Sequence, residues 1–317
     1  MSAAGPDVAV LGPGATIVVL DVGGTEIKTS VLDGGGRLAA PAHQPTPRGT
    51  DVVERVVDAV VAHVEATRTS NPDLAAVGLV VPGIVDAERG IAVFSENLDW
   101  HDVPFPALVA QRTGLPVGFG HDVATAGRAE VELGAGRNSP DVAVVVVGTG
   151  IAAAIVTGGV PLLAHGWAGE LGHSVVDPSG PTCVCGTRGC LEAIASTAAI
   201  ARRYSAATGV PVPGSAEVLR FAEAGDPVAI QVWDEAVAAL AAGIRQLAAI
   251  VSPEVVVIGG GLSRAGAALF DPLADAVRAT VKPHRVPQLR PAAIGAYAGL
   301  VGAAMLGREA VGAEVPR

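Results

Sequence analysis

The sequence predicts an α/β protein with two domains, and three observations lead to this prediction. A length of 317 residues is large for one hydrophobic core and comfortable for two domains of ordinary size. Half of the residues are hydrophobic, mostly Ala and Val, and only 3% are aromatic, which suits closely packed layers of helices and strands. Two glycine-rich turns, one near Gly23 and one near Gly148, each lie between two apolar β-type runs.

The chain is acidic, with 21 Lys and Arg against 31 Asp and Glu and a net charge of −10. It has no basic run, so we expect no nucleic-acid partner, because phosphate contacts need clustered Lys and Arg. No apolar run reaches the ~18 residues that would span a membrane. Residues 1–15 lack the charged start of a signal peptide. We therefore expect a disordered lead-in there, a cytoplasmic location and no membrane partner.

The first glycine-rich turn, DVGGT at residues 21–25, joins the β-type runs 16–21 and 27–32. Its two glycines, Gly23 and Gly24, let backbone N–H groups approach an anion, Thr25 adds a hydroxyl, and Asp21 offers a carboxylate to a metal ion. Taken alone, such a turn is also typical of a plain β-hairpin.

Three further segments precede the second turn. Residues 50–67 have apolar positions at helical spacing, which predicts an amphipathic helix. Residues 79–86 are predicted to form a buried strand that runs into a Pro-Gly turn. Asn97 lies in a predicted loop at 95–100. A short strand at 117–120 then leads to His121 and Asp122, which open a helical stretch. An Asp at such a position often only caps the helix.

The second turn, GTGI at residues 148–151, follows the apolar run 142–147 and repeats the pattern of the first. No Walker or dinucleotide fingerprint is present. Downstream, Ala-rich helical segments are predicted at 197–208, 215–224 and 228–251. A buried strand at 255–258 then ends in Gly259, Gly260 and Gly261.

All three cysteines of the chain lie in one stretch with a histidine: His173, Cys183, Cys185 and Cys190. A Cys₃His set of this spacing is typical of a structural zinc site. The alternative is three small hydrophobic residues and a satisfied histidine, but the clustering favours a metal. Glu170 and Glu192 flank the series, and their carboxylates, together with the free ring nitrogen of a metal-bound histidine, predict a site for a sugar or another polyol.

The motifs ELGH and CVCGTRGCLE resemble the Glu-x-Gly-His and Cys-x-Cys-Gly-x-x-Gly-Cys-x-Glu signatures of the ROK family of bacterial sugar kinases and sugar-responsive repressors. The resemblance extends over about residues 16–306. It implies an actin-like ATPase (ribonuclease H-like) fold. The small N-terminal domain would comprise 16–121 completed by a C-terminal helix at 295–317, and the larger domain 122–294 with a zinc loop at 173–190.

The resemblance also implies roles for individual residues. Asp122 matches the family's catalytic aspartate, the general base toward the 6-hydroxyl of the sugar. The residues that match sugar ligands are Asn97, His121, Asp122, Glu170, His173 and Glu192. The residues expected to contact ATP and its Mg²⁺ are Asp21, Gly23, Gly24, Thr25, Lys28, Gly148, Thr149, Gly150, Gly260 and Gly261.

The chain departs from the family pattern at several positions. Glu26 replaces a frequent Lys, and residues 152–154 are alanines in place of further glycines. Lys28 lies on the same strand face as position 26, so we expect it to supply the missing charge. Glucokinases of the family have Pro-Asn and Asn-Asp where this chain has Glu96-Asn97 and His121-Asp122. These departures make a plain glucose site less expected. The pattern GHD, with PGIVDAERGI and SENLDW, resembles actinobacterial ROK kinases that act on N-acetylglucosamine, and this resemblance favours N-acetylglucosamine narrowly over glucose.

The primary hypothesis is an ATP-dependent sugar kinase with a structural zinc ion, and no residue distinguishes polyphosphate from ATP as the donor. A second hypothesis is a sugar-sensing repressor. Repressors of the family carry a winged helix-turn-helix ahead of the first hairpin, whereas only 15 residues precede it here, so we expect no DNA-binding part. A zinc scaffold without activity would leave both glycine-rich turns unexplained. Family members commonly form dimers or tetramers, and we expect a homo-oligomer.

Overall fold

The computed structural model of the protein describes residues 8–9 and 11–312 and confirms an α/β architecture. The described residues form two compact units. The first unit comprises the chain up to Ala129, Leu163–Ala168 and the chain from Tyr297 onward; the second comprises Glu130–Leu162 and Gly169–Ala296. The division after Ala129 falls inside helix α3 (Asp122–Glu132), eight residues beyond the domain boundary expected from the sequence.

A mixed sheet forms the centre of the first unit, with strand order β1-β4-β3-β2-β6-β10 and with β5 also paired to β3. Strands β2 and β3 form the predicted hairpin, and β6 and β10 extend the sheet in parallel with β2. The bounds are β1 Val8–Ala9, β2 Thr16–Val22, β3 Glu26–Leu32, β4 Arg37–Leu38, β5 Ala42–Pro45, β6 Leu74–Val81 and β10 Val117–His121.

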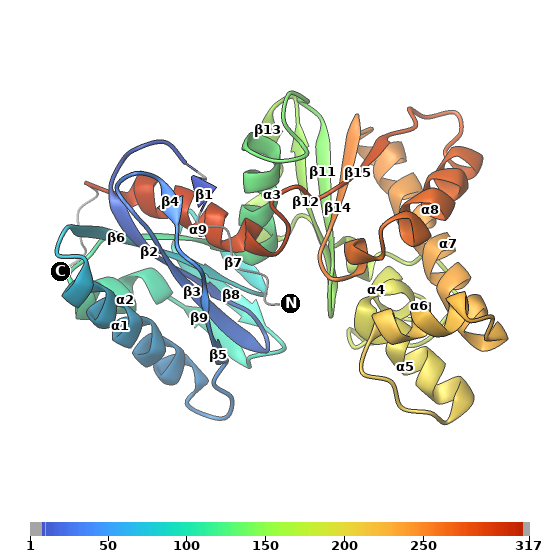
Figure 1. The fold of residues 1–317 in the computed structure, drawn as a ribbon, viewed down its shortest axis with the longest axis horizontal. Helices are drawn as coiled ribbons and strands as arrows, with labels where there is room; N and C mark the ends of the chain where they lie inside the picture. Colours follow the sequence, from blue (N-terminus) through green and yellow to red (C-terminus); the bar gives the residue numbers. More distant parts are fainter. Residues whose placement is uncertain (1–7, 10, 313–317) are drawn as a thin grey trace. The chain divides into compact units, whose positions relative to one another are not determined.

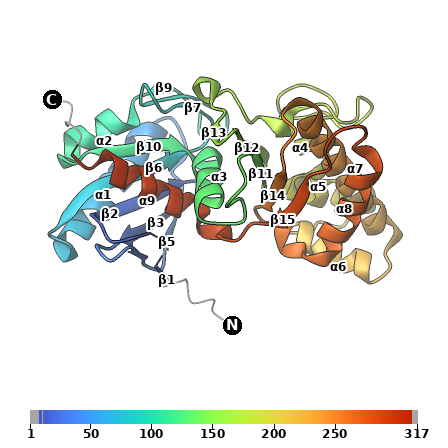
Figure 2. The same ribbon diagram turned by 90° about the horizontal axis from the view of Figure 1, so that it is seen from above.

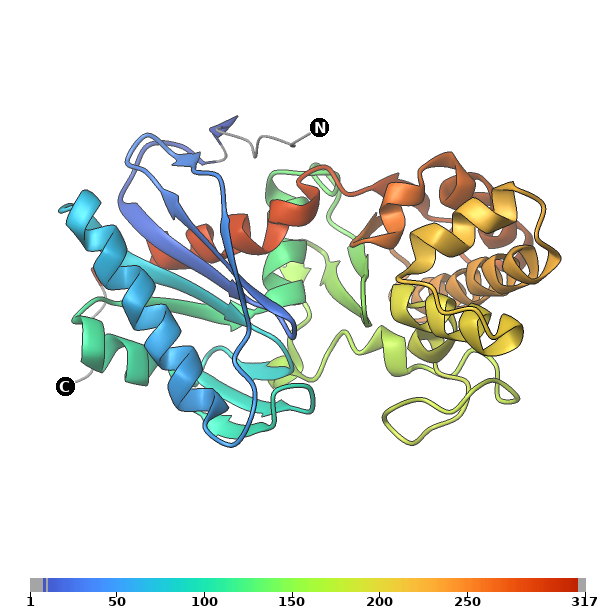
Figure 3. The same ribbon diagram turned by 60° about the horizontal axis from the view of Figure 1, so that its bottom comes forward.

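Helices α1 (Val52–Ser70) and α2 (Phe105–Thr113) cover one face of this sheet, and α9 (Ala298–Ala310) covers the other (Figure 1). The valines of α1 that repeat at helical spacing pack on alternate residues of β2, as amphipathic patterning requires. Figure 3 shows α1 running along its face of the sheet.

Helix α9 packs with its backbone directly on the sheet, because two strands present glycine to it. A Cβ atom at Gly78 would lie 2.0 Å from the carbonyl oxygen of Ala303, and one at Gly118 would lie 2.1 Å from that of Leu306. Any larger residue would push the helix away. The C-terminal helix of the described residues therefore lies against the sheet of the N-terminal part of the chain. Residues 313–317 lie outside the described residues.

The first unit also contains a three-stranded sheet that the sequence did not predict: β7 (Ile84–Asp86), β8 (Ile91–Ser95) and β9 (Trp100–Val103). The predicted single strand at 79–86 is broken at Gly83, whose φ of 95° turns the chain. Asn97 therefore lies in the turn that joins β8 to β9.

The expectation that residues 1–15 are disordered is wrong for part of that segment. Strand β1 pairs with β4, and the N–H groups of Leu11 and Gly14 donate to the carbonyl oxygens of Gly36 and Gly34. The edge strand β4 offers unpaired backbone groups that order the incoming chain. Residues 1–7 and 10 lie outside the described residues.

The second unit is built on a sheet with strand order β13-β12-β11-β14-β15. Its bounds are β11 Val142–Val147, β12 Ile151–Thr157, β13 Val160–Pro161, β14 Val255–Gly259 and β15 Gln288–Pro291. The helices packed beside it (Figure 2) are α4 Leu191–Ala195, α5 Thr197–Thr208, α6 Ser215–Glu223, α7 Pro227–Ile250 and α8 Ala267–Thr280. The three predicted helical segments match α5, α6 and α7, whereas α8 was not predicted. The short 3₁₀ helices of the chain are η1 Ala164–Gly166, η2 Leu171–His173, η3 Leu262–Ala265 and η4 Gly295–Tyr297.

Among the described residues, α7 is the helix long and apolar enough to cross a membrane by length and composition. In its most apolar window, 56% of the residues are buried inside the protein. Its buried side chains, among them Trp233, Leu240 and Ile244, belong to the main core of the second unit. This is the pattern of a core helix.

Candidate active site and metal centre

The turn after β2 is held by hydrogen bonds that leave its tip open. The Gly23 N–H donates to the Glu26 carbonyl oxygen at 2.9 Å, which closes the turn. The Thr46 hydroxyl donates to the Gly23 carbonyl oxygen at 2.7 Å, and the Arg48 guanidinium donates to the Gly24 carbonyl oxygen. Thr25 at the tip is exposed. The turn is therefore rigid, and a cation lies beside it, as an anion-binding turn requires.

Asp21 is the buried carboxylate of this turn. Burial raises its pKa to about 6 from an ordinary value of 3.8; Lys28 opposes this rise, and the charge of Asp122 adds to it. The Lys28 Nζ lies 3.7 Å from the Asp21 Oδ2. A Cβ atom at Gly299, at the start of α9, would lie 2.6 Å from the same oxygen. Because burial disfavours the ionised form of Asp21, a bound cation would stabilise its negative charge.

Lys28 does not extend freely from the sheet. Its Nζ also lies 3.9 Å from the Glu26 Oε1, and the Glu26 Oε2 contacts the His43 Nδ1 at 3.1 Å. Lys28 is therefore shared between two carboxylates. That Lys28 replaces the family's cation at position 26 stays a prediction.

Asp122 lies at the same edge of the sheet as Asp21. Strands β2, β6 and β10 run in parallel, with Asp21 opposite Val80 and His121 opposite Val81. The carboxyl ends of parallel strands are where α/β proteins place their ligands. The Asp122 Oδ1 accepts the Val123 N–H at 2.7 Å and lies 3.1 Å from the His121 Nε2.

Asn97 is brought to the first turn by the unpredicted small sheet. A Cβ atom at Gly24 would lie 3.8 Å from the Asn97 Cβ. The Arg48 guanidinium, which holds Gly24, also donates to the Asn97 carbonyl oxygen at 3.4 Å. One arginine thus ties the glycine turn to the loop that carries Asn97.

The second glycine turn, after β11, is held in a similar way within the second unit. The Gly148 N–H donates to the Gly150 carbonyl oxygen at 2.9 Å, and both the hydroxyl and the N–H of Thr197 donate to the Gly148 carbonyl oxygen, at 2.8 and 2.9 Å. The Glu192 Oε2 accepts the Ile151 N–H at 2.8 Å. Glu192 is therefore already bound to this turn through one carboxylate oxygen.

Two glycines that are expected to contact ATP, Gly260 and Gly261, lie beside this second turn. Gly260 has a φ of 80°, and a Cβ atom there would lie 2.4 Å from the Val147 carbonyl oxygen. A Cβ atom at Gly261 would lie 3.7 Å from the Thr197 Cγ2. The strand ends that carry the two glycine runs are therefore in close backbone contact, which leaves no space for side chains at Gly260.

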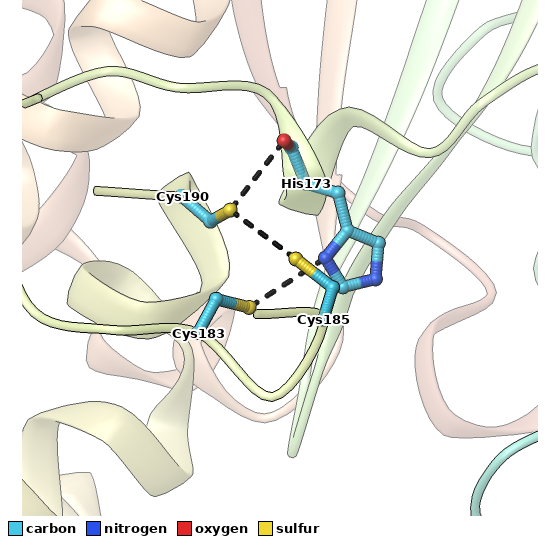
Figure 4. A group of neighbouring side chains, drawn as sticks. All are labelled: His173, Cys183, Cys185 and Cys190. Carbon is cyan, nitrogen blue, oxygen red and sulfur yellow. Dashed lines mark hydrogen bonds between the residues drawn. The ribbon is translucent and has the colours of Figure 1, made fainter. Parts of the chain in front are cut away.

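The three cysteines and His173 converge on one point (Figure 4). The Cys183 Sγ lies 3.6 Å from the His173 Nδ1, the Cys185 Sγ lies 3.7 Å from the Cys190 Sγ, and all four ligand atoms lie within 4.8 Å of one another. Zinc–sulfur bonds of about 2.3 Å in a tetrahedron place sulfurs about 3.8 Å apart. The four side chains fit a zinc ion.

The protein environment acts differently on two of these thiols. A hydrogen bond from the Thr187 backbone lowers the pKa of Cys185 to about 6, whereas burial raises that of Cys190 to about 12. A buried thiol that resists ionisation in the free protein is the kind of group that a bound cation converts to a thiolate ligand.

Glu170 lies on the opposite side of the His173 ring from the cysteines. The Glu170 Oε2 lies 3.8 Å from the His173 Nε2, while Nδ1 faces Cys183. A Cβ atom at Gly172 would lie 2.1 Å from the Ile151 carbonyl oxygen, so the ELGH segment presses on β12. This geometry leaves one imidazole nitrogen and one carboxylate for a polar ligand.

The predicted site residues thus form two groups. Asp21, Gly23, Gly24, Thr25, Lys28, Asn97, His121 and Asp122 lie in the first unit; Gly148, Thr149, Gly150, Glu170, His173, Glu192, Gly260 and Gly261 lie in the second. Sequence reasoning missed Thr46, Arg48 and Thr197. Only Thr197 gave a usable signal, since it opens a predicted helix five residues after Glu192.

Comparisons with known proteins give matches over most of the chain. The ROK family model matches residues 17–310. The glucokinase of Thermotoga maritima is 34% identical over 95% of this chain and 99% of its own length. The ROK hexokinase from Thermus thermophilus superposes with a TM-score of 0.78 at 36% identity, over 92% of this chain and 97% of that one. A ROK family glucokinase from Streptomyces griseus, solved with glucose and AMPPNP, gives 0.77 at 33% identity, over 93% and 99%.

Proposed function

Because this chain belongs to the ROK family and its full-length relatives are hexose kinases, we propose that it transfers the γ-phosphoryl group of ATP to the 6-hydroxyl of an aldohexose. One observation supports this most strongly. The two carboxylates Asp21 and Asp122 stand at the carboxyl ends of parallel strands in one sheet, and Asp21 adjoins the open glycine turn. In that position Asp122 can act as a general base and Asp21 can hold a metal ion, as phosphoryl transfer requires.

In the proposed step, Asp122 takes the proton of the sugar 6-hydroxyl while the hydroxyl oxygen bonds to the γ-phosphorus. The bond from that phosphorus to the bridging oxygen breaks, and ADP leaves with the electron pair. Asp122 then returns its proton to solvent. Backbone N–H groups of the two glycine turns, at Gly23–Thr25 and Gly148–Gly150, would hold the phosphates. Mg²⁺ bound near Asp21 would neutralise phosphate charge.

Zinc would have a structural role. Four protein ligands, His173, Cys183, Cys185 and Cys190, leave no open position for water or substrate. A zinc ion there would fix the ring of His173 through Nδ1 and leave Nε2, beside Glu170, for a sugar hydroxyl. It would also fix Cys190 at the start of α4, which carries Glu192.

For the sugar, we place glucose first, because the Thermotoga maritima and Streptomyces griseus relatives bear the name glucokinase. N-acetylglucosamine, which the departures at Glu96 and His121 favour, is the second candidate. The sequence feature in its favour is that Glu96 and His121, which adjoin the expected sugar ligands Asn97 and Asp122, both differ from the glucokinase pattern.

A coupled assay of ADP release with glucose, mannose, N-acetylglucosamine and N-acetylmannosamine tests the proposal. We expect activity with at least one of them, and the ratio of kcat/KM values identifies the sugar. Sugar 6-phosphate formation with polyphosphate in place of ATP tests the donor. Sugar binding by calorimetry with no phosphorylation of any sugar would contradict the kinase and support a sugar sensor. Cytoplasmic location, which suits reduced zinc thiols, and a homo-oligomer stay predictions.

A further inference from the structure

We propose that His121 is a positioning residue of this reaction. In this proposal, the imidazole holds the Asp122 carboxylate by one oxygen, so that the other oxygen receives the proton of the sugar hydroxyl. The proposal deepens the kinase function above and rests on it. It also gives His121 a different task from the sugar contact that the family resemblance implies.

The contacts of the imidazole fix which nitrogen carries the proton. His121 is the last residue of β10, and its Nδ1 accepts the Ala124 N–H at 3.3 Å. A neutral imidazole has a single N–H, so the proton lies on Nε2. This nitrogen lies 3.1 Å from the Asp122 Oδ1. The ring therefore caps the first turn of α3 with Nδ1, and in this proposal it donates to the carboxylate with Nε2, which lies 3.1 Å from Oδ1.

In this proposal two donors meet on the same oxygen of Asp122. The Val123 N–H donates to Oδ1 at 2.7 Å, and the His121 Nε2 lies 3.1 Å from Oδ1. Rotating the carboxylate would break both contacts, so Oδ2 is left for the substrate. After proton transfer to Oδ2, Oδ1 is the carbonyl oxygen of a carboxylic acid, and it still accepts both donors. The arrangement therefore serves both protonation states of the base.

His121 has no nitrogen left over for a sugar hydroxyl in this arrangement. Its side chain is only 20% exposed, and both ring nitrogens face protein groups. An asparagine at this position, as in the family pattern, has a shorter side chain and a single amide nitrogen. The replacement by histidine thus places an N–H farther from the backbone, within reach of the base.

Two substitutions separate the two nitrogens. In His121→Asn the side-chain oxygen takes the place of Nδ1 and keeps the bond to the Ala124 N–H, but no donor reaches Asp122. In His121→Gln the amide N–H takes the place of Nε2 and keeps the donor, but the cap is lost. We expect kcat to fall about tenfold or more in His121→Asn, because the proposed hydrogen bond to a charged group is lost. We expect kcat to stay within about threefold in His121→Gln.

The opposite pattern would overturn the proposal. If His121 only caps α3, the Asn variant keeps kcat and the Gln variant loses thermal stability. If His121 reads a sugar hydroxyl, the dissociation constant of the sugar, measured by calorimetry without ATP, rises in both variants. We expect it to change by less than about twofold in either, since the contact is to Asp122 and not to sugar.

A double substitution tests whether His121 acts through Asp122. In the Asp122→Asn background, adding His121→Asn should reduce kcat by no more than about twofold further, because the group being positioned is gone. A full tenfold additional loss would mean that His121 acts elsewhere and would overturn the proposal. A wild-type protein that phosphorylates no sugar would remove the kinase function and this role together. An active wild type with the wrong variant pattern removes this role alone.

Discussion

The two glycine turns of this protein share a backbone and differ in their chemistry. In each turn the first glycine N–H closes the turn, and a threonine hydroxyl from another segment donates to the carbonyl oxygen of that glycine: Thr46 to Gly23 and Thr197 to Gly148. This common geometry presents free N–H groups to an anion. This hydrogen-bonding pattern is the feature that the two turns share.

The charges around the two turns are unequal. The first turn has Asp21, Glu26, Lys28 and Arg48 around it, all from its own hairpin or the segment after β5. The second turn is bonded to one carboxylate, Glu192, from the helix that follows the cysteine loop. The first turn is therefore complete within ordinary secondary structure, whereas the second depends on a segment that a metal ion would shape. Each prediction below perturbs one turn and leaves the other as a reference.

Removing the metal should have the largest effect and should act on the second turn. In Cys190→Ser, or after chelation, we expect loss of zinc and of nearly all activity. Zinc-dependent folding of comparable loops is worth on the order of 10 kcal/mol. Elemental analysis and activity measure this. Val184→Ala, an exposed non-ligand within the same loop, is the matched control. Freshly purified protein without zinc, still active after chelation, would contradict the structural metal.

Next in size is the loss of the base beside the first turn. Asp122→Asn should lower kcat by on the order of 10²-fold or more, because general base catalysis is removed while the side-chain shape is kept. The affinity for the sugar should change little. Steady-state kinetics and calorimetry check the two quantities. A variant with near-normal kcat would exclude Asp122 from the role.

The buried charge of Asp21 should appear in the pH dependence of stability. Its pKa is about 6 in the folded protein and 3.8 in an ordinary environment, so the folded state binds more protons between these values. The free energy of unfolding therefore falls as pH rises through that window, by no more than ~3 kcal/mol. Asp21→Asn cannot ionise. We expect it to unfold at a higher temperature than the wild type at pH 8, with the difference vanishing near pH 4.

The control for Asp21 is an exposed carboxylate of the same unit. Glu88→Gln should show no such pH-dependent difference. Calorimetric scans at both pH values decide the matter. If Asp21→Asn is less stable than the wild type at pH 8, the ion pair with Lys28 outweighs the cost of burial.

The smallest effects compare the two threonines directly. Thr46→Val and Thr197→Val each remove one hydroxyl with little change of shape. The Gly148 carbonyl oxygen keeps the Thr197 N–H as a second donor, whereas the hydroxyl is the donor that Thr46 gives to Gly23. We expect a loss of roughly 1–3 kcal/mol for Thr46→Val and about 1 kcal/mol for Thr197→Val. Equal losses would mean that the second donor does not compensate.

The parts of this protein that sequence reasoning predicted have local signals. The zinc ligands lie within one stretch, each glycine turn lies between two β-type runs, and α5 has clear apolar spacing. The small sheet β7–β9 was missed because Pro82-Gly83 looks like the end of a strand. A Cβ atom at Gly83 would lie 2.1 Å from the Phe94 carbonyl oxygen. The backbone at Gly83 therefore packs against a strand that follows later in the chain, and the local sequence at Pro82-Gly83 does not show this contact.

Contacts across long separations gave no signal at all. Arg48 reaches Asn97 from 49 positions away, and Glu192 reaches the Ile151 N–H from 41 positions away. Nothing near Arg48 in the sequence marks it as the residue that joins two loops. The candidate site residues were predicted from motifs, whereas the contacts that hold them are seen only in the fold.

The close packing of α9 on Gly78 and Gly118 has a consequence for how the chain folds during synthesis. The first unit needs residues 298–310 to cover one face of its sheet, and these leave the ribosome after every residue of the second unit. Domains usually fold in the order in which they are made. Here we expect the reverse order: the second unit folds first, and the first unit stays incompletely folded until α9 has been made. A released chain that ends after residue 296 should therefore resist protease in residues 169–296 and be cleaved in residues 16–121. Protection of both segments would show that the sheet of the first unit folds stably without α9.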